Sequence, residues 1–316
     1  MEEVDPRTRV LAIDGGQSAI RAMSTESDDV VEVEGVSRDA SSEDRVVEAV
    51  ASAWRTLGRP AIDRVMLGLT TAPVDPERAQ SMAERVGAAV GAAEVWLCDD
   101  AVTSHAGALS CGRGISLTAG TGVACLVIPE RGEPTIIGGH GYLLGDEGGG
   151  FWIGREGLRS ALRAAEGRGS PTELVELASQ RFGPLGQVPV LLHDDHRPID
   201  TIARFATDVL TAAADDGVAE SIVEVAADEL YGVICAAVDV AERAEEVTPV
   251  PLALGGRLLT VPTLLRTALD VRLRSERRVA ARTADASPLV GAMSIGTQPT
   301  PGRYASLVHV WRGDAA

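Results

Sequence analysis

The chain has 316 residues, of which 45% are hydrophobic, so it can bury a large core and is long enough for about two domains. Its formal net charge of -17 disfavours polyanionic partners such as nucleic acid or an acidic membrane surface. All basic residues are arginine, and neither lysine nor asparagine occurs. Any clamp on phosphate must therefore use arginine, backbone N–H groups or a metal ion.

The four cysteines, Cys98, Cys111, Cys125 and Cys235, show neither CxxC nor zinc-site spacing. This pattern fits reduced thiols in the cytoplasm. The first ten residues are acidic and lack the apolar core of a signal peptide, and no stretch approaches the ~20 apolar residues of a membrane span. We therefore expect a soluble, cytoplasmic protein with no membrane partner.

The first third of the chain predicts strands that alternate with helices. Residues 9–16 form an apolar run that ends in Asp-Gly-Gly, typical of a strand entering a tight turn. Residues 19–25 and 30–36 alternate in polarity and predict an antiparallel continuation. A helix with a capping serine is predicted over 41–58, followed by a buried strand over 64–70.

The next segment repeats this order. Asp75 and Pro76 match the N-cap and first-turn preferences of a helix that extends to about residue 91. Residues 94–100 predict a strand that ends in two acids, and residues 101–111 look helical. This alternation is typical of an α/β unit.

Strand character returns at residue 114 and opens a second unit. Residues 114–139 predict a hairpin that turns at 130–132, and residues 152–243 are mostly helical. A strand over 251–259 and a helix over 262–273 follow. The basic run 270–282 predicts a helix or loop with a solvated face, and small apolar residues over 287–297 predict a packed helix; for residues 303–316 we have no prediction.

Four glycine-bearing turns each follow a predicted strand, at 13–18, 118–122, 145–150 and 254–257. Glycine allows several backbone N–H groups to converge on an anion, because no Cβ blocks the approach. Neither the Walker A pattern nor G-x-G-x-x-G is present. A single turn of this kind is weak evidence for phosphate contact, but two of them on either side of the acids at 98–100 form a more demanding pattern. The two nucleotide-binding folds that those motifs mark are disfavoured.

The turn at 145–150 carries two adjacent acids, Asp146 and Glu147, directly before an apolar helix. An ionised carboxylate on such a bare backbone can accept hydrogen bonds from two neighbouring hydroxyls. Either acid could instead cap the following helix, and the two roles could coexist.

The order of these motifs resembles the superfamily of sugar kinases, Hsp70 and actin. Within it, the stretch GGHGYLLGDEGGGFWIGREGL at 138–158 resembles the Gly-Gly-Trp-Gly…Gly-Asp-Glu-Gly-Ser block of the N-acetylglucosamine kinase and BadF/BadG/BcrA/BcrD ATPase branch. The resemblance implies an α/β fold of two actin-like, ribonuclease H-like lobes with an interdomain cleft. It places the first lobe at residues 1–110, completed by a C-terminal helix at about 286–316, and the second at 111–285.

The resemblance also implies Mg-ATP as the phosphoryl donor. Asp14 would hold Mg²⁺ through water, which suits an ion that keeps most of its hydration shell. The residues that would bind ATP lie in the glycine turns and in the helical segment near 215: Gly15, Gly16, Gln17, Ser18, Gly120, Thr121, Gly122, Asp215, Gly255 and Gly256.

By the same resemblance, Asp100 would be the general base that takes the proton of the attacking hydroxyl. Its alternative role is that of a helix N-cap, for which Asp99 is the other candidate. Asp146 would bind the sugar hydroxyls. The other residues implied at the substrate are Gly139, His140, Gly141, Val123 and Glu147.

Three departures from the branch leave the substrate open. His140 replaces the tryptophan of the block, Val123-Ala124 replaces a polar pair that helps to bind the N-acetyl sugar, and Asp215 stands where a glycine usually approaches the nucleotide. N-acetylglucosamine, glucosamine and a related sugar or aminocyclitol all remain candidates. A homodimer is possible, because dimers are common in the branch.

Other activities are disfavoured. An ATPase activator of the BadF type, without sugar phosphorylation, would need cysteines for a shared iron–sulfur cluster, but Cys98, Cys111 and Cys125 fall in predicted strands or a helix. A nucleotide-binding regulator would not need both Asp100 and Asp146. We expect His105 to be a core residue and the segment at 193–196 to be a polar loop rather than a metal site.

Overall fold

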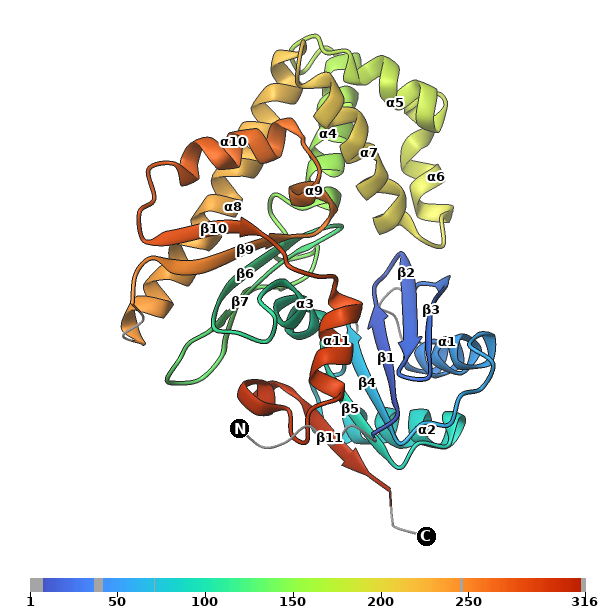
Figure 1. Cartoon of the computed structure of the whole chain (residues 1–316). Coiled ribbons are helices and arrows are strands. Elements are labelled where there is room, and N and C mark those ends of the chain that lie inside the picture. Colours follow the sequence, from blue (N-terminus) through green and yellow to red (C-terminus); the bar gives the residue numbers. More distant parts are fainter. Residues whose placement is uncertain (1–7, 37–41, 71, 245–246, 314–316) are drawn as a thin grey trace. The chain divides into compact units, whose positions relative to one another are not determined.

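The computed structural model describes residues 8–36, 42–70, 72–244 and 247–313. The chain divides into two compact units (Figure 1). Unit 1 comprises residues 1–116, 128–135 and 284–316, and unit 2 comprises residues 117–127 and 136–283.

Unit 1 is built on a six-stranded sheet with the order β11-β5-β4-β1-β2-β3. The central strand β1 (Val10–Gly15) pairs antiparallel with β2 (Ala19–Ser24), which pairs antiparallel with β3 (Ser27–Glu34). On its other side, β1 pairs parallel with β4 (Arg64–Leu69), and β4 pairs parallel with β5 (Glu94–Asp99). The predicted strands and the antiparallel meander are confirmed.

The C-terminal segment, for which we had no prediction, supplies the sixth strand. After a 3-10 helix at Gly302–Leu307, β11 (His309–Arg312) pairs antiparallel with β5. The Trp311 ring covers helix α2 so closely that a Cβ on Gly87 would lie 2.4 Å from its Cζ3 atom. β11 thereby covers an edge of β5 that would otherwise present unpaired backbone groups.

The helices of unit 1 lie within a few residues of the predicted ranges, and the predicted capping serine at the start of the range 41–58 lies outside the described residues. α1 spans Ser42–Thr56, α2 spans Pro76–Val90, α3 spans Asp100–Ala108 and α11 spans Pro288–Gly296. The Asp75 carboxylate accepts the Glu77 N–H in α2, and the Ser287 side chain accepts from the backbone of α11. These side-chain caps satisfy N–H groups that a helix cannot pair internally.

His105 on α3 is fully buried, as predicted for a core residue. Its Nδ1 lies 2.9 Å from the Tyr304 hydroxyl and its Nε2 lies 3.2 Å from the Gly114 carbonyl. The carbonyl can only accept, so Nε2 carries the proton and Nδ1 accepts from the Tyr304 hydroxyl. Burial lowers the pKa of His105 to about 4, so the ring is neutral near pH 7.

Unit 2 repeats the strand order of unit 1. Its five-stranded sheet has the order β10-β9-β6-β7-β8, with β6 in the place of β1. The strands are β6 (Gly114–Ala119), β7 (Val123–Ile128), β8 (Thr135–Gly138), β9 (Val250–Gly255) and β10 (Val279–Thr283). The hairpin predicted over 114–139 is confirmed as part of this sheet.

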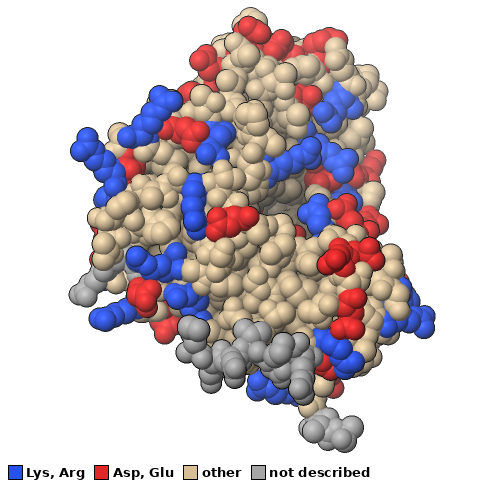
Figure 2. All heavy atoms as spheres, viewed as in Figure 1, with Lys and Arg blue, Asp and Glu red and all other residues tan. Residues whose placement is uncertain are grey.

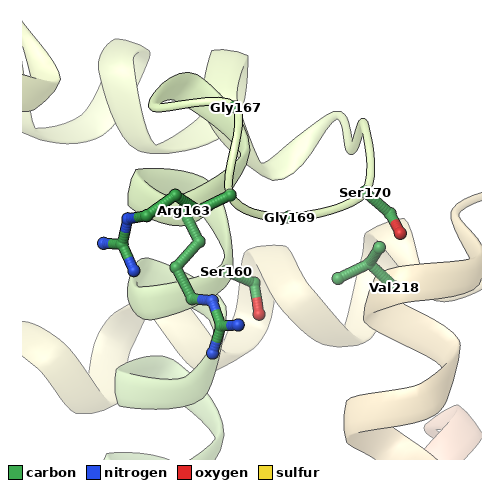
Figure 3. A pocket seen from close by; sticks show the side chains of 7 residues that line it. Ser160, Arg163, Gly167, Gly169, Ser170 and Val218 are labelled. Atoms are coloured by element: carbon green, nitrogen blue, oxygen red, sulfur yellow. The ribbon is translucent and has the colours of Figure 1, made fainter.

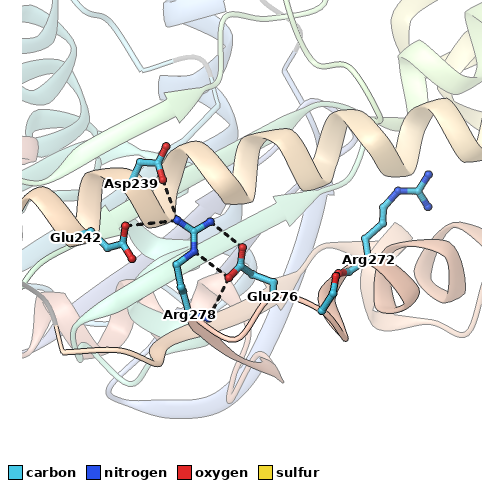
Figure 4. A network of polar contacts seen from close by, with 6 residues as sticks. Asp239, Glu242, Arg272, Glu276 and Arg278 are labelled. Carbon is cyan, nitrogen blue, oxygen red and sulfur yellow. Dashed lines mark hydrogen bonds and ion pairs between the residues drawn. The ribbon is translucent and has the colours of Figure 1, made fainter.

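The prediction of a helix or loop for the basic run 270–282 is wrong at its end, because residues 279–283 form β10, parallel to β9. Its neighbour Arg278 bonds Glu276 and pairs with Asp239 and Glu242 of α8 (Figure 4). Asp239 and Glu242 lie far from Arg278 in the sequence, so a local sequence pattern does not predict these ion pairs.

The predicted helical region of unit 2 is confirmed. It contains α4 (Gly150–Ala165), α5 (Leu174–Phe182), α6 (Val188–Asp194), α7 (Pro198–Ala212) and α8 (Gly217–Arg243), and α9 (Arg257–Thr260) and α10 (Leu264–Leu273) follow β9. The polar loop predicted at 193–196 is wrong in part, because His193 and Asp194 end α6.

Two findings concern the described residues as a whole. No group of three or more histidine, cysteine, aspartate or glutamate side chains within them is placed to hold a metal ion. None of the helices in those ranges is long and apolar enough to cross a bilayer. Acidic and arginine side chains are interspersed on the face shown in Figure 2.

Helix α11 packs against α3 at a glycine, Gly291, where the two backbones approach closely. A Cβ on Gly291 would lie 2.0 Å from the Thr103 carbonyl oxygen and 2.4 Å from the Gly107 nitrogen, both backbone atoms. We expect Gly291→Ala to destabilise the protein by about 1–3 kcal/mol, because two helices must separate.

The control is Gly232→Ala in the middle of α8, where a Cβ would meet nothing within 4 Å. This substitution should be neutral or stabilising by about 0.5–1 kcal/mol, because alanine favours helix. Thermal unfolding monitored by circular dichroism measures both, and equal midpoints for the two variants would contradict the packing argument.

Candidate active site

Unit 1 presents a glycine turn between its first two strands. The Gly16 N–H donates to the Ala19 carbonyl at 2.9 Å and closes the turn. A Cβ on Gly15 would lie 2.3 Å from the Leu69 Cδ2 atom, so this position has no room for a side chain. Residues 15–18 therefore form the tight, bare turn that the sequence predicts, with Gln17 and Ser18 at its tip.

Unit 2 has its counterpart between β6 and β7. The Gly120 N–H donates to the Gly122 carbonyl at 2.9 Å. Helix α4 begins against this turn, since the N–H groups of Gly150 and Phe151 donate to the carbonyls of Gly120 and Thr121 at 2.8 and 2.9 Å. Two N–H groups of the first turn of α4, which have no partner within the helix, thus fix the position of residues 120–122.

A third glycine turn lies beside this one in unit 2. Gly256 follows β9 with φ 80, in the left-handed region that favours glycine. A Cβ on Gly256 would lie 2.3 Å from the Ala119 oxygen, at the end of β6. The structure therefore brings residues 255–256 to the same sheet edge as residues 120–122.

Asp100 directly follows the carboxyl end of β5 and is the first residue of α3. The N-cap of α3 is Asp99, whose carboxylate accepts the Ala101 N–H at 2.9 Å. The capping role is thus taken by the neighbour, as the sequence allowed, and the Asp100 carboxylate instead accepts the Thr70 hydroxyl at 2.6 Å.

Burial raises the pKa of Asp100 to about 7, and the negative charges of Asp99 and Asp14 add to the effect, while the Thr70 hydrogen bond opposes it. Asp14 is the penultimate residue of β1, and burial raises its pKa as well, opposed by Arg21, whose guanidinium lies 3.9 Å away. A carboxyl group with a pKa near 7 can take and release a proton at neutral pH.

The carboxylate of Asp14 fits a water-mediated Mg²⁺. It is largely shielded from solvent, and its raised pKa shows that the charged form lacks stabilisation there, which a divalent cation would supply. Mg²⁺ usually keeps several waters and takes only one or two carboxylates, so one acid is sufficient.

Asp146 occupies a strained position in unit 2, with φ 63, which is uncommon for a residue other than glycine. Its Oδ1 accepts the Val123 N–H at 3.1 Å. A Cβ on Gly122 would lie 2.5 Å from its Oδ2 atom, so the carboxylate lies directly on the 120–122 turn. Such strain is a feature of functional sites.

The alternative role, in which Asp146 or Glu147 caps α4, is ruled out. The N-cap of α4 is Gly149, and no side chain bonds to the cap. The helix instead uses the 120–121 carbonyls. The Asp146 carboxylate is therefore not committed to the helix, and burial raises its pKa while the Val123 N–H and His140 oppose the rise.

The remaining predicted site residues lie as follows. Gly139 and Gly141 have φ 70 and 77 and flank the exposed His140, and Glu147 is also exposed. The Val123 side chain is buried, so only its backbone faces the Asp146 carboxylate. Asp215 is exposed in the turn before α8, where its neighbour Asp216 is the N-cap.

Sequence reasoning missed Thr70 and Arg21. Thr70 was assigned only as the last residue of a buried strand. The available signal was that 9–16, 64–70 and 94–100 all end in polar residues, since the carboxyl ends of parallel strands meet at one sheet edge. Arg21 lies on β2, opposite Asp14 in the antiparallel register.

A separate cavity of about 630 Å³ lies at the far end of α4 (Figure 3). Arg163 lies thirteen residues beyond Gly150, or about 20 Å at the rise of an α-helix. The cavity is therefore distinct from the glycine turns. Its lining residues are Ser160, Arg163, Gly167, Arg168, Gly169, Ser170 and Val218.

The strand order shared by both sheets defines a duplicated ribonuclease H-like fold, the class that includes the actin-like sugar kinases. The BadF/BadG/BcrA/BcrD ATPase family matches residues 11–296, and the chain belongs to this family. This match confirms the family that we expected from the sequence. The two sheets confirm the expected α/β fold of two lobes.

Several proteins are similar to the chain. It is 29% identical over 174 residues to an N-acetylmuramic acid/N-acetylglucosamine kinase of Clostridium acetobutylicum, a match that covers 52% of this chain and 57% of that protein. A candidate N-acetylglucosamine kinase from Chromobacterium violaceum shares the fold with a TM-score of 0.70 and 23% identity, covering 92% and 99% of the two chains. A Schistosoma mansoni hexokinase complexed with glucose has a TM-score of 0.55 and 15% identity, covering 92% and 85%.

The raised pKa of Asp100 predicts a dependence of stability on pH. A carboxyl whose folded pKa lies above its unfolded value stabilises the fold at low pH and loses that contribution as pH rises through about 7. We expect Asp100→Asn to raise the melting temperature at pH 8 by about 2–6 °C, with a smaller gain at pH 5.

Differential scanning calorimetry between pH 5 and 8 measures this trend. Asp75→Asn makes the same chemical change at the exposed N-cap of α2 and should show no such gain. A gain in melting temperature for Asp100→Asn that is constant from pH 5 to 8 would contradict the raised pKa of Asp100.

Proposed function

We propose that the chain is a kinase that transfers the γ-phosphate of Mg-ATP to a hydroxyl of an N-acetylglucosamine-like amino sugar, with Asp100 as general base. The observation that carries this proposal is the Asp100 carboxyl at the carboxyl end of β5, with a pKa of about 7 and a hydrogen bond to Thr70. Family membership and the Clostridium acetobutylicum relative support the reaction class.

In this mechanism, Asp100 takes the proton of the sugar hydroxyl. The sugar oxygen forms a bond to the γ-phosphorus while the bond from that phosphorus to the β–γ bridging oxygen breaks, which leaves ADP. Asp14 would hold Mg²⁺ through water, and the bound ion would supply neutralisation of phosphate charge. Phosphoryl transfer depends mainly on such alignment and charge neutralisation.

ATP would lie along the glycine turns. The N–H groups and hydroxyls at 15–18 and 120–122, including those of Ser18 and Thr121, would bind the phosphates, and Gly255, Gly256 and Asp215 would lie at the adenosine. Asp100 would act on the hydroxyl that is phosphorylated and Asp146 on neighbouring hydroxyls, and exclusion of water from the bound sugar would keep water from competing as acceptor.

Asp146 would bind the sugar. Its carboxylate is held by the Val123 backbone and leaves acceptor capacity for hydroxyl groups, because a carboxylate accepts about four hydrogen bonds. The left-handed turn at Gly139 and Gly141 keeps the adjacent backbone bare for close approach. His140 and Glu147, both exposed, would line the same pocket.

The buried Val123 side chain offers no hydrogen bond to an N-acetyl group. A polar group of the substrate placed there without a partner would cost about 1–3 kcal/mol. The acceptor class that we propose therefore includes glucosamine and an aminocyclitol besides N-acetylglucosamine and N-acetylmuramic acid. We place the reaction in the cytoplasm, where ATP is available, with a homodimer as a possible assembly.

An ATPase activator of the BadF type is the alternative. The prediction that Cys111 lies in a helix is wrong, because it follows the end of α3 in a turn, next to Gly112 and with φ 58. Cys98 and Cys125 are fully buried in strands. One glycine-flanked cysteine does not supply the pair that a shared cluster needs in each chain.

The test of function is ADP release from ATP, measured with a coupled assay over amino sugars, neutral hexoses and cyclitols. We expect at least one amino sugar to stimulate release strongly. Asp100→Asn should lower kcat by about 10²–10⁴-fold, since the general base is lost. The wild-type kcat/KM should fall as pH drops below about 7, because the base becomes protonated.

The matched control is Asp75→Asn, which should keep wild-type turnover. Release of ADP that no sugar stimulates would favour the ATPase alternative. Full activity of Asp100→Asn would eliminate this residue as the base.

Asp146 gives an independent prediction. Asp146→Asn keeps the size of the side chain and one acceptor oxygen but loses charge-assisted hydrogen bonds, worth about 1.5–3 kcal/mol. We expect the KM for the sugar to rise by about 10- to 100-fold, with the slow hydrolysis of ATP in the absence of sugar unchanged. Steady-state kinetics with varied sugar measures both; an unchanged KM would remove Asp146 from the sugar site.

A further inference from the structure

Thr70 joins two parts of the site in unit 1. Its backbone N–H donates to the Gly15 carbonyl at 2.9 Å, which ties the end of β4 to the first glycine of the 15–18 turn. Its hydroxyl lies 2.6 Å from the Asp100 Oδ2 atom and 3.3 Å from the same Gly15 oxygen. One hydroxyl group therefore has two acceptors within reach.

A hydroxyl donates only one proton, so the two contacts compete. While Asp100 is ionised, the shorter bond to a charged acceptor is the stronger one. Once Asp100 carries a proton, that proton can be donated to the Thr70 oxygen, and the Thr70 hydroxyl can turn to the Gly15 carbonyl. Both charge states of Asp100 then have a partner.

We propose that Thr70 is a positioning residue for Asp100, whose hydroxyl holds the ionised carboxylate in one orientation and turns to the Gly15 carbonyl when the carboxylate takes up a proton. The proposal rests on the proposed kinase function. No atom of Thr70 is transferred.

The surroundings of Asp100 make this partner necessary. Asp99 precedes it and Asp14 lies in β1, and their negative charges raise its pKa, as does the hydrogen bond between the Asp99 and Asp100 side chains. The hydroxyl of Thr70, which follows β4, opposes this rise. Without the hydroxyl, an ionised and partly buried Asp100 would face like charges with less compensation, and its side chain would be free to rotate.

The first test compares Thr70→Val, Thr70→Ser and wild type in the sugar-dependent assay. Valine keeps the shape but removes the hydroxyl, so we expect kcat to fall by about 10- to 100-fold while the KM values for sugar and ATP change by less than about 3-fold. Serine restores the hydroxyl and should return most of kcat. The pH at which kcat/KM is half-maximal should rise for valine alone.

The control is Thr56→Val on α1, whose hydroxyl bonds only the Ser52 carbonyl and is exposed, and it should keep wild-type kinetics. A Thr70→Val enzyme with wild-type kcat, or a loss that serine does not restore, would overturn the proposal. A loss confined to KM would instead make Thr70 a binding residue and would also overturn it.

A second measurement does not depend on activity. Thermal unfolding of Thr70→Val, Asp100→Ala and the double variant reports whether the two side chains interact, since contacting residues give non-additive shifts. Additive shifts would overturn the proposal. Non-additive shifts in a protein without sugar-stimulated ADP release would show instead that the contact exists and that the proposed function fails.

Discussion

The unit 1 site depends on a carboxylate that is kept away from water beside two other acids. Burial and the charges of Asp99 and Asp14 raise the pKa of Asp100 to about 7, and the Thr70 hydroxyl limits the rise. A carboxylate of ordinary pKa would be a poor base, and a carboxyl raised much further would stay protonated at neutral pH. The parallel pairing of β1, β4 and β5 creates this balance, because it brings the three strand ends to one sheet edge.

Unit 2 has the same strand order as unit 1 but holds its acid, Asp146, through a backbone N–H group. Its turn at 120–122 lies on the start of α4, and the Asp146 carboxylate lies on that turn through the Val123 N–H. The backbone of Val123, not its side chain, therefore supports the acid. The support that Asp146 receives from residue 123 therefore does not depend on which side chain stands there.

Much of the fold followed from local signals. Asp75 marks a helix start, and apolar runs over 9–16, 64–70 and 94–100 mark strands, because capping and side-chain periodicity act over a few residues. The strand at 279–283 did not follow, since the basic run that contains it has the pattern of a solvated face and two of the acids paired with Arg278 lie on α8. The cap of α4 could not be chosen from the sequence, because carbonyls some thirty residues earlier in the chain take the place of a capping side chain.

The sequence by itself determined the family, most of the strands and helices, and the acids and glycines of the candidate site, because these depend on residue types at short spacing. The tertiary structure alone decided that Asp99 rather than Asp100 caps α3, that Thr70 bonds Asp100, and that residues 309–312 complete the sheet of unit 1. Each of these is a contact between segments far apart in the chain, or a choice between neighbours that such a contact settles. Hydrogen bonds of that kind depend on which strands pair with one another. Local sequence patterns do not determine this pairing.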